Sequence, residues 1–321
     1  MAAVFQQGFA LVVGVGDDLP NTIDDAKGLA NILKDEGRCA YPANQVNLLV
    51  SEAATRENIL SGLDNLAQTS NPDATVTIYF SGHGYHVETS IGSQYYLLPY
   101  GYDLKKLHKT AMNGGEFAEK LRAIPAKKLL ILLDCCHAGG VGDAKVPGLE
   151  LTKAPLPPEA LNFLQEGRGR VLIASCKEDE LSYAFPSQTY SVFTRVLMEA
   201  LCGEGVAKKD GYVRVSDIAL HCREIVPQRT KDKQHPILHW EESDNFVVAY
   251  YASGEKEPKL LPDELIQGQS QTTEQNTMSE TNSQPQASQS GGFNQTGWKV
   301  KGDVYQAARD IVIQKENKKK D

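Results

Sequence analysis

The sequence predicts an α/β fold, with a mainly parallel central sheet and helices on both of its faces. Short apolar runs alternate along the chain with segments of helical period, an order typical of strands joined by crossover helices. The run Leu129–Leu133 contains five apolar residues without polar alternation, as expected of a strand that is covered on both faces. With 321 residues, the chain is long enough to bury one sizeable core.

The first strand is expected at Phe9–Val15, where an apolar run ends in the turn-forming segment GVGDDLPN. This segment is not a nucleotide-binding loop, because it lacks both the third glycine of a dinucleotide motif and the Gly-Lys-Ser/Thr ending of a phosphate loop. A helix is then expected from Thr22, whose hydroxyl can cap it while Asp25 returns the bond three residues later.

The later elements are assigned by the same two periods and by residue type. The expected strands are residues 45–50, 74–80, 95–99, 129–133, 170–174 and 246–251, and the expected helices are residues 55–66, 116–123, 190–201 and 210–225. Strands that alternate with helices in this order predict parallel pairing with right-handed crossovers.

Two of the expected strands end in residues that carry chemistry. Ala74–Phe80 is followed by His83, which lies between two glycines and so leaves room for a substrate chain and an inward amide N–H. Leu129–Leu133 is followed by an acid and then by Cys135 and Cys136. Ligands of open α/β sheets sit beyond the carboxyl ends of the strands, so a thiol there is a candidate nucleophile. Two adjacent cysteines are also compatible with core packing, since Cys is among the most buried residue types.

The histidine and cysteine segments, YFSGHGYH and LLILLDCCHAGG, resemble the catalytic motifs of the caspase-like cysteine peptidases. The likeness is nearest to the metacaspase and bacterial orthocaspase branch, whose cysteine motif reads Asp-x-Cys-His-x-Gly. His83 precedes Cys136 by 53 residues, and a histidine about 50 residues before the cysteine is a caspase feature. The resemblance covers residues 5–252 and implies a caspase-like three-layer sandwich.

Strand alternation separates the two cysteines, because Asp134 and Cys136 share one side while Cys135 faces the other, into packing. Cys136 is therefore the expected nucleophile and Cys135 a structural residue. His83 is the expected base that moves the proton to the leaving amine, and the N–H groups of Gly84 and Cys136 are the expected oxyanion donors. His137 and His86, which are close in sequence to the motifs, are interpreted as surface or supporting residues.

Three residues are expected to form the pocket for the side chain before the cut bond. These residues are Asp25, Ser81 and Asp134. The resemblance implies that Asp25 lines this pocket, because the metacaspase branch carries an acid at this early helix start; a capping role for Asp25 is compatible with it. If the three converge, the pocket is acidic and hydroxylated, which suits Arg or Lys. No arginine lies beside either motif, so specificity for Asp is not expected.

No metal or other cofactor is expected to be required. Asp143 falls where some metacaspases have a calcium ligand, so the resemblance makes calcium conceivable. The stretch GSQYYLLPYGYD, which would have to supply the companion ligands, contains a single acid, Asp103. A hard cation needs several oxygen ligands, so calcium is not expected to be necessary.

The composition and the resemblance together divide the chain. The expected parts are a caspase-like peptidase domain at 1–255 with its large part at 1–140, connector at 141–169 and small part at 170–255, a linker at 256–297 and a C-terminal motif at 298–321. The connector carries four prolines and no clear period, and activating cleavage in the family often falls there. The linker is expected to be disordered, since 21 of the 30 residues from 267 to 296 are Gln, Asn, Ser or Thr.

The C-terminal motif contains a β-prone segment, WKVKGDVYQAARDIVIQ, at residues 298–314. It is similar in character to the short amyloid-type motifs that end some bacterial and fungal defence effectors, where a receptor with a matching motif recruits the enzyme. The similarity implies homotypic assembly with a receptor through residues 298–314. A helix from Val304 to Ile313 and simple disorder are alternatives that the sequence leaves open.

Composition and charge restrict the remaining function classes. A net charge of −8 argues against a general grip on nucleic acid. No apolar run approaches a membrane span and no signal peptide opens the sequence, so we expect neither a membrane partner nor export. The six cysteines have no paired spacing, which suggests reduced thiols and a cytoplasmic location.

These features predict a cysteine endopeptidase that cleaves proteins or peptides after Arg or Lys, with a role in regulated cell death or defence by analogy with the family. One rival is a catalytically idle adaptor that acts through the C-terminal motif. The other is a zinc hydrolase or deaminase that uses His83, His86, Glu88 and the two adjacent cysteines. Deaminases space their cysteines as Cys-x-x-Cys, which adjacent cysteines do not match.

Overall fold

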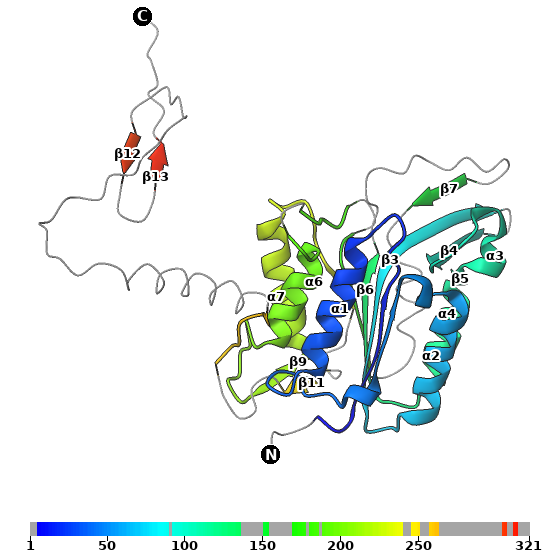
Figure 1. The fold of residues 1–321 in the computed structure, drawn as a ribbon, viewed down its shortest axis with the longest axis horizontal. Helices are drawn as coiled ribbons and strands as arrows, with labels where there is room; N and C mark the ends of the chain where they lie inside the picture. The colour runs from blue at the N-terminus through cyan, green and yellow to red at the C-terminus, as the bar shows by residue number, and fades with distance from the viewer. Residues whose placement is uncertain are drawn as a thin grey trace, which may run out of the picture. The chain divides into compact units, whose positions relative to one another are not determined.

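The structure is a computed structural model of the whole chain. It describes residues 5–89, 92–135, 150–153, 169–177, 180–185, 188–239, 245–250, 257–262, 304–306 and 311–313. The chain separates into two compact units, residues 1–268 and residues 269–321, and Figure 1 shows the elements of both.

A nine-stranded sheet is the centre of the first unit. The strands on its main path, in the order β10-β8-β6-β3-β1-β2, are β1 (Gly8–Gly14), β2 (Val46–Val50), β3 (Thr75–Thr89), β6 (Lys128–Cys135), β8 (Arg170–Ala174) and β10 (Ile237–His239). All neighbours on this path are parallel except β10, which runs antiparallel to β8. This arrangement confirms the predicted mainly parallel sheet.

Helices cover both faces of the sheet (Figure 1). One face carries α1 (Asn21–Lys34), α6 (Val192–Leu201) and α7 (Val215–Arg229), and the other carries α2 (Arg56–Thr69) and α4 (Gly114–Ala123). Leu130 and Leu132 of β6 point into the core with α1 and α6, whereas Leu129, Ile131 and Leu133 point into the core with α2 and α4. The alternation explains why this strand is apolar throughout.

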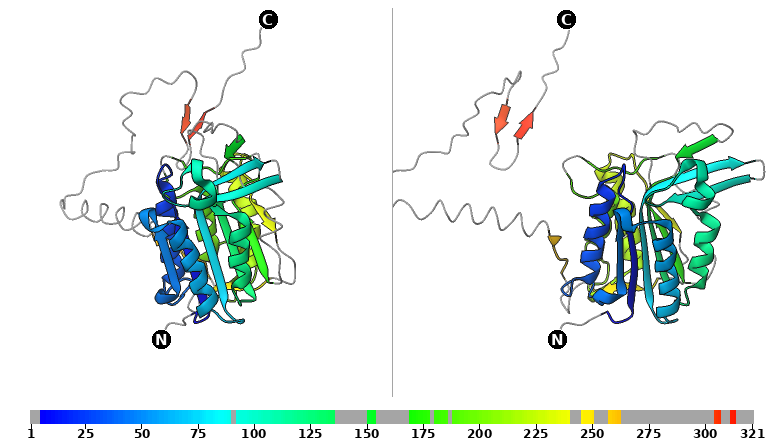
Figure 2. Two further views of the ribbon diagram at one scale, coloured as in Figure 1. Left: turned by 90° about the vertical axis from the view of Figure 1, so that its right-hand side faces the viewer. Right: turned by 45° about the vertical axis from the view of Figure 1, so that its right-hand side comes forward.

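The third strand is longer than the sequence predicts. It was expected to end at Phe80, but β3 continues through His83 to Thr89 and there pairs antiparallel with β4 (Gly92–Leu98). Figure 2 shows this hairpin leaving the parallel sheet at its carboxyl edge. The hairpin has a core of its own, in which Tyr85 and Leu98 are buried, so packing extends the strand beyond the two glycines that flank His83.

Two short strands and several short helical turns complete this region. They are β5 (Met112–Asn113), which pairs with β4, β7 (Glu150–Lys153), which pairs with β3, α3 (Leu107–Thr110), and the 3-10 turns Ala43–Gln45, Ser51–Ala53 and Leu104–Lys106. Neither β7 nor β10 was expected from the sequence, because each is too short to show a period.

Three other expectations are corrected. Thr22 does not cap α1, because its hydroxyl accepts a bond from the N–H of Gly16 and donates to the carbonyl of Leu19. The segment expected as a helix at 210–225 begins instead with β9 (Tyr212–Arg214). The last expected strand, β11 (Val247–Tyr250), pairs with β9 in a separate two-stranded sheet and not with the main sheet.

The described part of the second unit is a two-stranded antiparallel sheet. It consists of β12 (Val304–Gln306) and β13 (Ile311–Ile313), with Tyr305 opposite Val312. These strands replace the helix that the sequence left open over this segment. Among the described residues of either unit, no helix has both the length and the apolar character needed to cross a membrane.

Candidate active site

The parallel register brings the expected site residues to one edge of the sheet. Ser81 of β3 lies opposite Asp134 of β6, and the next pair along the ladder joins Gly82 to Cys135. Ser81 also lies opposite Gly14, the last residue of β1. The carboxyl ends of β1 and β6 therefore meet the point where the parallel pairing of β3 stops, which is the edge where open α/β sheets bind ligands.

His83 is held in a defined position one residue beyond this ladder. Its side chain is only 3% exposed, and its Nε2 atom lies 2.8 Å from Oδ1 of Asp18, in the turn between β1 and α1. His83 is paired with Leu98, and Gly84 with Leu97, in the β3–β4 hairpin. The imidazole is thus removed from bulk water and hydrogen-bonded to a carboxylate, an environment suited to proton transfer.

Asp134 is a buried carboxylate that three hydroxyl groups surround. Ser191 donates to its Oδ2 atom at 2.7 Å, Thr194 donates to the same atom at 3.1 Å, and Ser182 donates to Oδ1 at 3.0 Å. Ser191 also caps α6, because its oxygen accepts the N–H of Thr194. The start of α6 is therefore attached directly to the end of β6.

Asp25 lies beside Asp134, and only one of its two carboxyl oxygens has a hydrogen-bond partner among the described residues. It is 0% exposed, and its Oδ1 atom accepts the backbone N–H of Ser191 at 2.8 Å. Its Oδ2 atom has no hydrogen-bond partner in the part of the chain that the structure describes. Burial, and next the charge of Asp134, raise the pKa of Asp25 well above the usual range of a carboxyl group. One oxygen of this buried carboxyl group is therefore left without the hydrogen bond that usually offsets burial.

Tyr79 is a buried residue close to both acids. Its hydroxyl lies 2.6 Å from Oγ1 of Thr194, and burial raises its pKa well above the usual tyrosine value, with further contributions from the charges of Asp25 and Asp134. Tyr79 thus stays a neutral phenol. Ser81, two residues further along the same face of β3, is 2% exposed.

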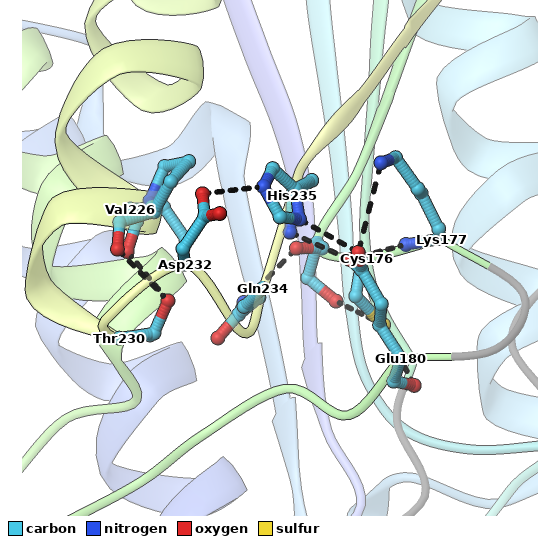
Figure 3. A network of polar contacts seen from close by, with 10 residues as sticks. Cys176, Lys177, Glu180, Val226, Thr230, Asp232, Gln234 and His235 are labelled. Carbon is cyan, nitrogen blue, oxygen red and sulfur yellow. Dashed lines mark hydrogen bonds and ion pairs between the residues drawn. The ribbon is translucent and has the colours of Figure 1, made fainter.

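The buried side-chain amide of Gln234 joins the loop that carries Ser182 to the end of β8. Gln234 is 0% exposed, donates from Nε2 to the carbonyl of Ser175 at 2.9 Å and to Oγ of Ser182 at 3.1 Å, and accepts the N–H of Tyr183 at 3.0 Å. Figure 3 shows Gln234 in the segment after α7, among polar contacts that also include Lys177 and Glu180. Gln234 therefore determines where the hydroxyl of Ser182 points.

A second group of contacts ties the same loop to the segment after α7 (Figure 3). His235 bonds through Nδ1 to Oε1 of Glu180 at 2.6 Å and through Nε2 to Oδ1 of Asp232 at 2.9 Å. The bond to Glu180, then the bond to Asp232, raise the pKa of His235. Partial burial opposes ionisation of Glu180, but the hydrogen bonds from His235 and Lys177 lower its pKa overall.

Cys135 faces away from the acids. It is 3% exposed and belongs to the core formed with α2 and α4, as strand alternation predicts. Burial, and then the charge of Asp134, raise the pKa of its thiol well above the usual value. A thiol in this position stays protonated and inaccessible, so Cys135 is unsuited to nucleophilic attack.

Several expected residues lie outside the described part of the chain. These residues are Cys136, His137 and Asp143. The structure describes the other expected residues, which are Asp25, Ser81, His83, Gly84, Asp134 and His86. All of them except His86 lie at the end of β6, in the adjoining part of β3, or in hydrogen-bonding contact with residues bonded to Asp134. Within the described residues, no three His, Cys, Asp or Glu side chains form a group that could hold a metal ion.

Sequence reasoning missed several residues that line this site. They are Asp18, Tyr79, Ser182, Ser191, Thr194 and Gln234. A serine just before an apolar helical run is a capping signal, so Ser191 could have been identified as a helix cap. Its bond to Asp134 could not, because 57 residues separate the two in sequence.

Comparison with a protein-family model agrees with this architecture. A family model described as the caspase domain matches residues 7–247. Among solved structures, the chain is similar to protein GSU0716 from Geobacter sulfurreducens, with 16% sequence identity, a TM-score of 0.48, and coverage of 74% of this chain and 96% of that chain. No curated protein matches the chain.

The His235 contacts predict a stability difference that depends on pH. Because the folded-state pKa of His235 is raised, its stabilisation is complete below the ordinary histidine value and is lost as pH rises through the raised value. His235→Gln should lower the free energy of unfolding by about 0.5–1 kcal/mol at pH 5.5, because the pair is partly exposed, and by less at pH 9.

Urea unfolding followed by circular dichroism measures this difference, with His108→Gln, at an exposed position, as the matched control. An equal loss at both pH values would show that protonation of His235 does not contribute.

Proposed function

Because the chain belongs to the caspase domain family, whose activity is that of cysteine peptidases, we propose that it is an endopeptidase with Cys136 as nucleophile and His83 as the proton-transferring base. The main support is the β3–β6 register, in which Gly82 and Cys135 lie opposite each other. Gly82 immediately precedes His83 in the sequence, and Cys135 immediately precedes Cys136, so each is joined by a peptide bond to a proposed catalytic residue. We assign the chain to the metacaspase and orthocaspase branch because of its Asp-x-Cys-His-x-Gly motif.

In the proposed reaction, the Cys136 thiolate attacks the carbonyl carbon of the cut bond and forms a tetrahedral oxyanion. Backbone N–H groups of Gly84 and Cys136 stabilise this oxyanion, and the His83 imidazolium gives its proton to the leaving amine as the C–N bond breaks. His83 then takes a proton from water, which hydrolyses the thioester and releases the thiolate. The buried position of His83 supports this role.

We propose that the substrate residue before the cut is Arg or Lys. The free oxygen of Asp25 and the adjacent carboxylate of Asp134 give the pocket two acids but only hydroxyl and amide donors among the described contacts. A guanidinium would supply the missing donors and offset the negative charge. An aspartate side chain would add a third carboxylate to a buried site, which is strongly unfavourable.

Neither rival function is favoured by the site. The zinc hypothesis needs both adjacent cysteines near one ion, but Cys135 packs on the opposite face of the sheet from Asp134 and its hydroxyl partners. A catalytically idle adaptor would not explain the bond between His83 and Asp18 or the Asp25 oxygen that lacks a partner among the described residues.

We therefore propose a cofactor-independent enzyme that does not require calcium. We also propose a cytoplasmic location, since the five described cysteines are unpaired.

The second unit supports an additional role in recruitment. Its two strands pair antiparallel, with Val304 opposite Ile313 and Gln306 opposite Ile311. A two-stranded sheet is only marginally stable alone and exposes edges that can add further strands. We propose that residues 298–314 assemble with a matching motif on a receptor, and that the enzyme acts in regulated cell death or defence signalling.

Peptide hydrolysis tests the catalytic assignment. Peptides that differ only before the bond should be cut after Arg and Lys and not after Asp, with equal rates in calcium and in a chelator. Cys136→Ala should lower kcat at least about a thousandfold, because the nucleophile is lost, whereas Cys135→Ala should keep most of it. Turnover of Asp peptides alone, or activity that survives in Cys136→Ala but not in Cys135→Ala, would contradict the assignment.

The pKa of Asp25 predicts that KM depends on pH. In the free enzyme Asp25 holds a proton below its raised pKa, and binding of Arg must displace this proton, so KM for Arg peptides should fall as pH rises through that pKa. Asp25→Asn should raise KM about tenfold or more and remove this dependence. Asp24→Asn, at the exposed neighbouring position, is the matched control; it should keep the pH dependence of KM, with a slightly lower midpoint because the Asp24 charge is the smallest contribution to the raised pKa of Asp25. A pH-independent KM in the wild type would refute the prediction.

Assembly of the C-terminal motif is tested in the full chain. Val312→Pro removes one N–H from β13, so sedimentation should find fewer large assemblies than in the wild type. Peptide hydrolysis should be unchanged, since the substitution lies in the second unit. Glu316→Pro, outside residues 298–314, is the control and should assemble normally. Identical sedimentation of wild type and Val312→Pro would refute assembly through these strands.

A further inference from the structure

The turn after β1 has an unusual and well-supported conformation. Gly16 and Asp17 both have positive φ, 73° and 57°, and the N–H of Leu19 returns to the carbonyl of Gly16 at 3.0 Å. Thr22 of α1 holds the turn from the other side, because its hydroxyl binds both Gly16 and Leu19 at 2.8 Å. A left-handed aspartate costs conformational energy, and this cost persists only where the surroundings enforce it.

This turn presents one carboxylate to the candidate active site. Asp18 follows the two positive-φ residues, and its Oδ1 atom lies 2.8 Å from Nε2 of His83. The segment does not match a nucleotide-binding loop, so phosphate binding does not account for its shape. The side chain of Asp18 is 33% exposed while that of His83 is 3% exposed, so the bond connects a solvent-accessible acid to a buried base.

We propose that Asp18 is a positioning residue for His83, which makes the site a Cys-His-Asp triad. The proposal rests on the proposed function and deepens it. A carboxylate at Nε2 favours the tautomer with its proton on that atom, so Nδ1 is the nitrogen that exchanges a proton with the thiol and the leaving amine. When Nδ1 gains a proton, the charge of Asp18 stabilises the imidazolium, as the carboxylate of a triad does.

The other ionisable groups near Asp18 and His83 do not account for the proposed stabilisation of the His83 imidazolium. Asp17 is adjacent in the turn, and Tyr102 and Tyr85 approach from the segment after β4 and from β3. Burial, then the charges of Asp18, Tyr85 and Asp17, raise the pKa of Tyr102 to about 12, so it remains a neutral phenol at neutral pH. Asp17 therefore provides the matched comparison: it carries the same charge in the same turn, and no hydrogen bond joins it to His83 among the contacts that the structure describes.

The test compares Asp18→Asn with Asp17→Asn in the full chain. Asp18→Asn keeps the shape but loses the charge, so kcat should fall about tenfold with KM unchanged, and the alkaline limb of the pH profile should move about one unit lower. Asp17→Asn should leave kcat within about twofold, because asparagine also tolerates a left-handed backbone. A purely structural role for Asp18 would lower thermal stability and leave the pH profile in place.

A second measurement does not depend on turnover. In the Cys136→Ala chain, NMR titration of the imidazole, assigned through His83→Gln, should give a lower midpoint with Asp18→Asn than without it. Unchanged midpoints would overturn the proposal, and so would equal effects of Asp17→Asn and Asp18→Asn. Failure to hydrolyse any peptide would count against the proposed function alone, since the titration would still establish or reject the coupling of Asp18 to His83.

Discussion

The register of the parallel strands is the constraint on which the rest of the structure depends. Ser81 lies opposite Asp134 and Gly82 opposite Cys135 because β3 and β6 pair without a shift along their length. A displacement of one residue would exchange the two faces of β6, placing an acid in the apolar core and a thiol in the acidic pocket. The two well-packed cores on either side of the sheet oppose such a shift, so packing far from the site determines its chemistry.

Buried charge is the second feature that organises the site. Asp25 and Asp134 come from different elements, and Ser191 joins them by binding Asp25 through its N–H and Asp134 through its hydroxyl. The same serine begins α6. Two acids at this depth are costly, and the cost is only partly offset by hydroxyl donors. The Arg or Lys side chain that we propose for the substrate would offset this cost by donating hydrogen bonds to the two acids.

Segments outside the strands hold the residues around the candidate site in place. Gln234 holds the loop of Ser182 against the end of β8, and His235 with Glu180 ties the same loop to the segment after α7. On the other side, the turn that carries Asp18 is held by Thr22 of α1. Asp134 and His83 are therefore contacted by two separate sets of residues, one from the Ser182 loop and the other from the turn after β1.

The amino-acid sequence by itself determined the sheet, most helices and the inward, buried position of Cys135, because these follow from period and strand alternation. Only the tertiary structure decided that β3 continues past His83, that Thr22 supports a turn instead of capping a helix, and that Asp18 reaches the imidazole. Apart from the local bonds of Thr22, the contacts that build the site join segments 48 to 166 residues apart, such as Ser182 with Asp134 and Ser191 with Asp25. They arise from packing across elements, and no local pattern records them.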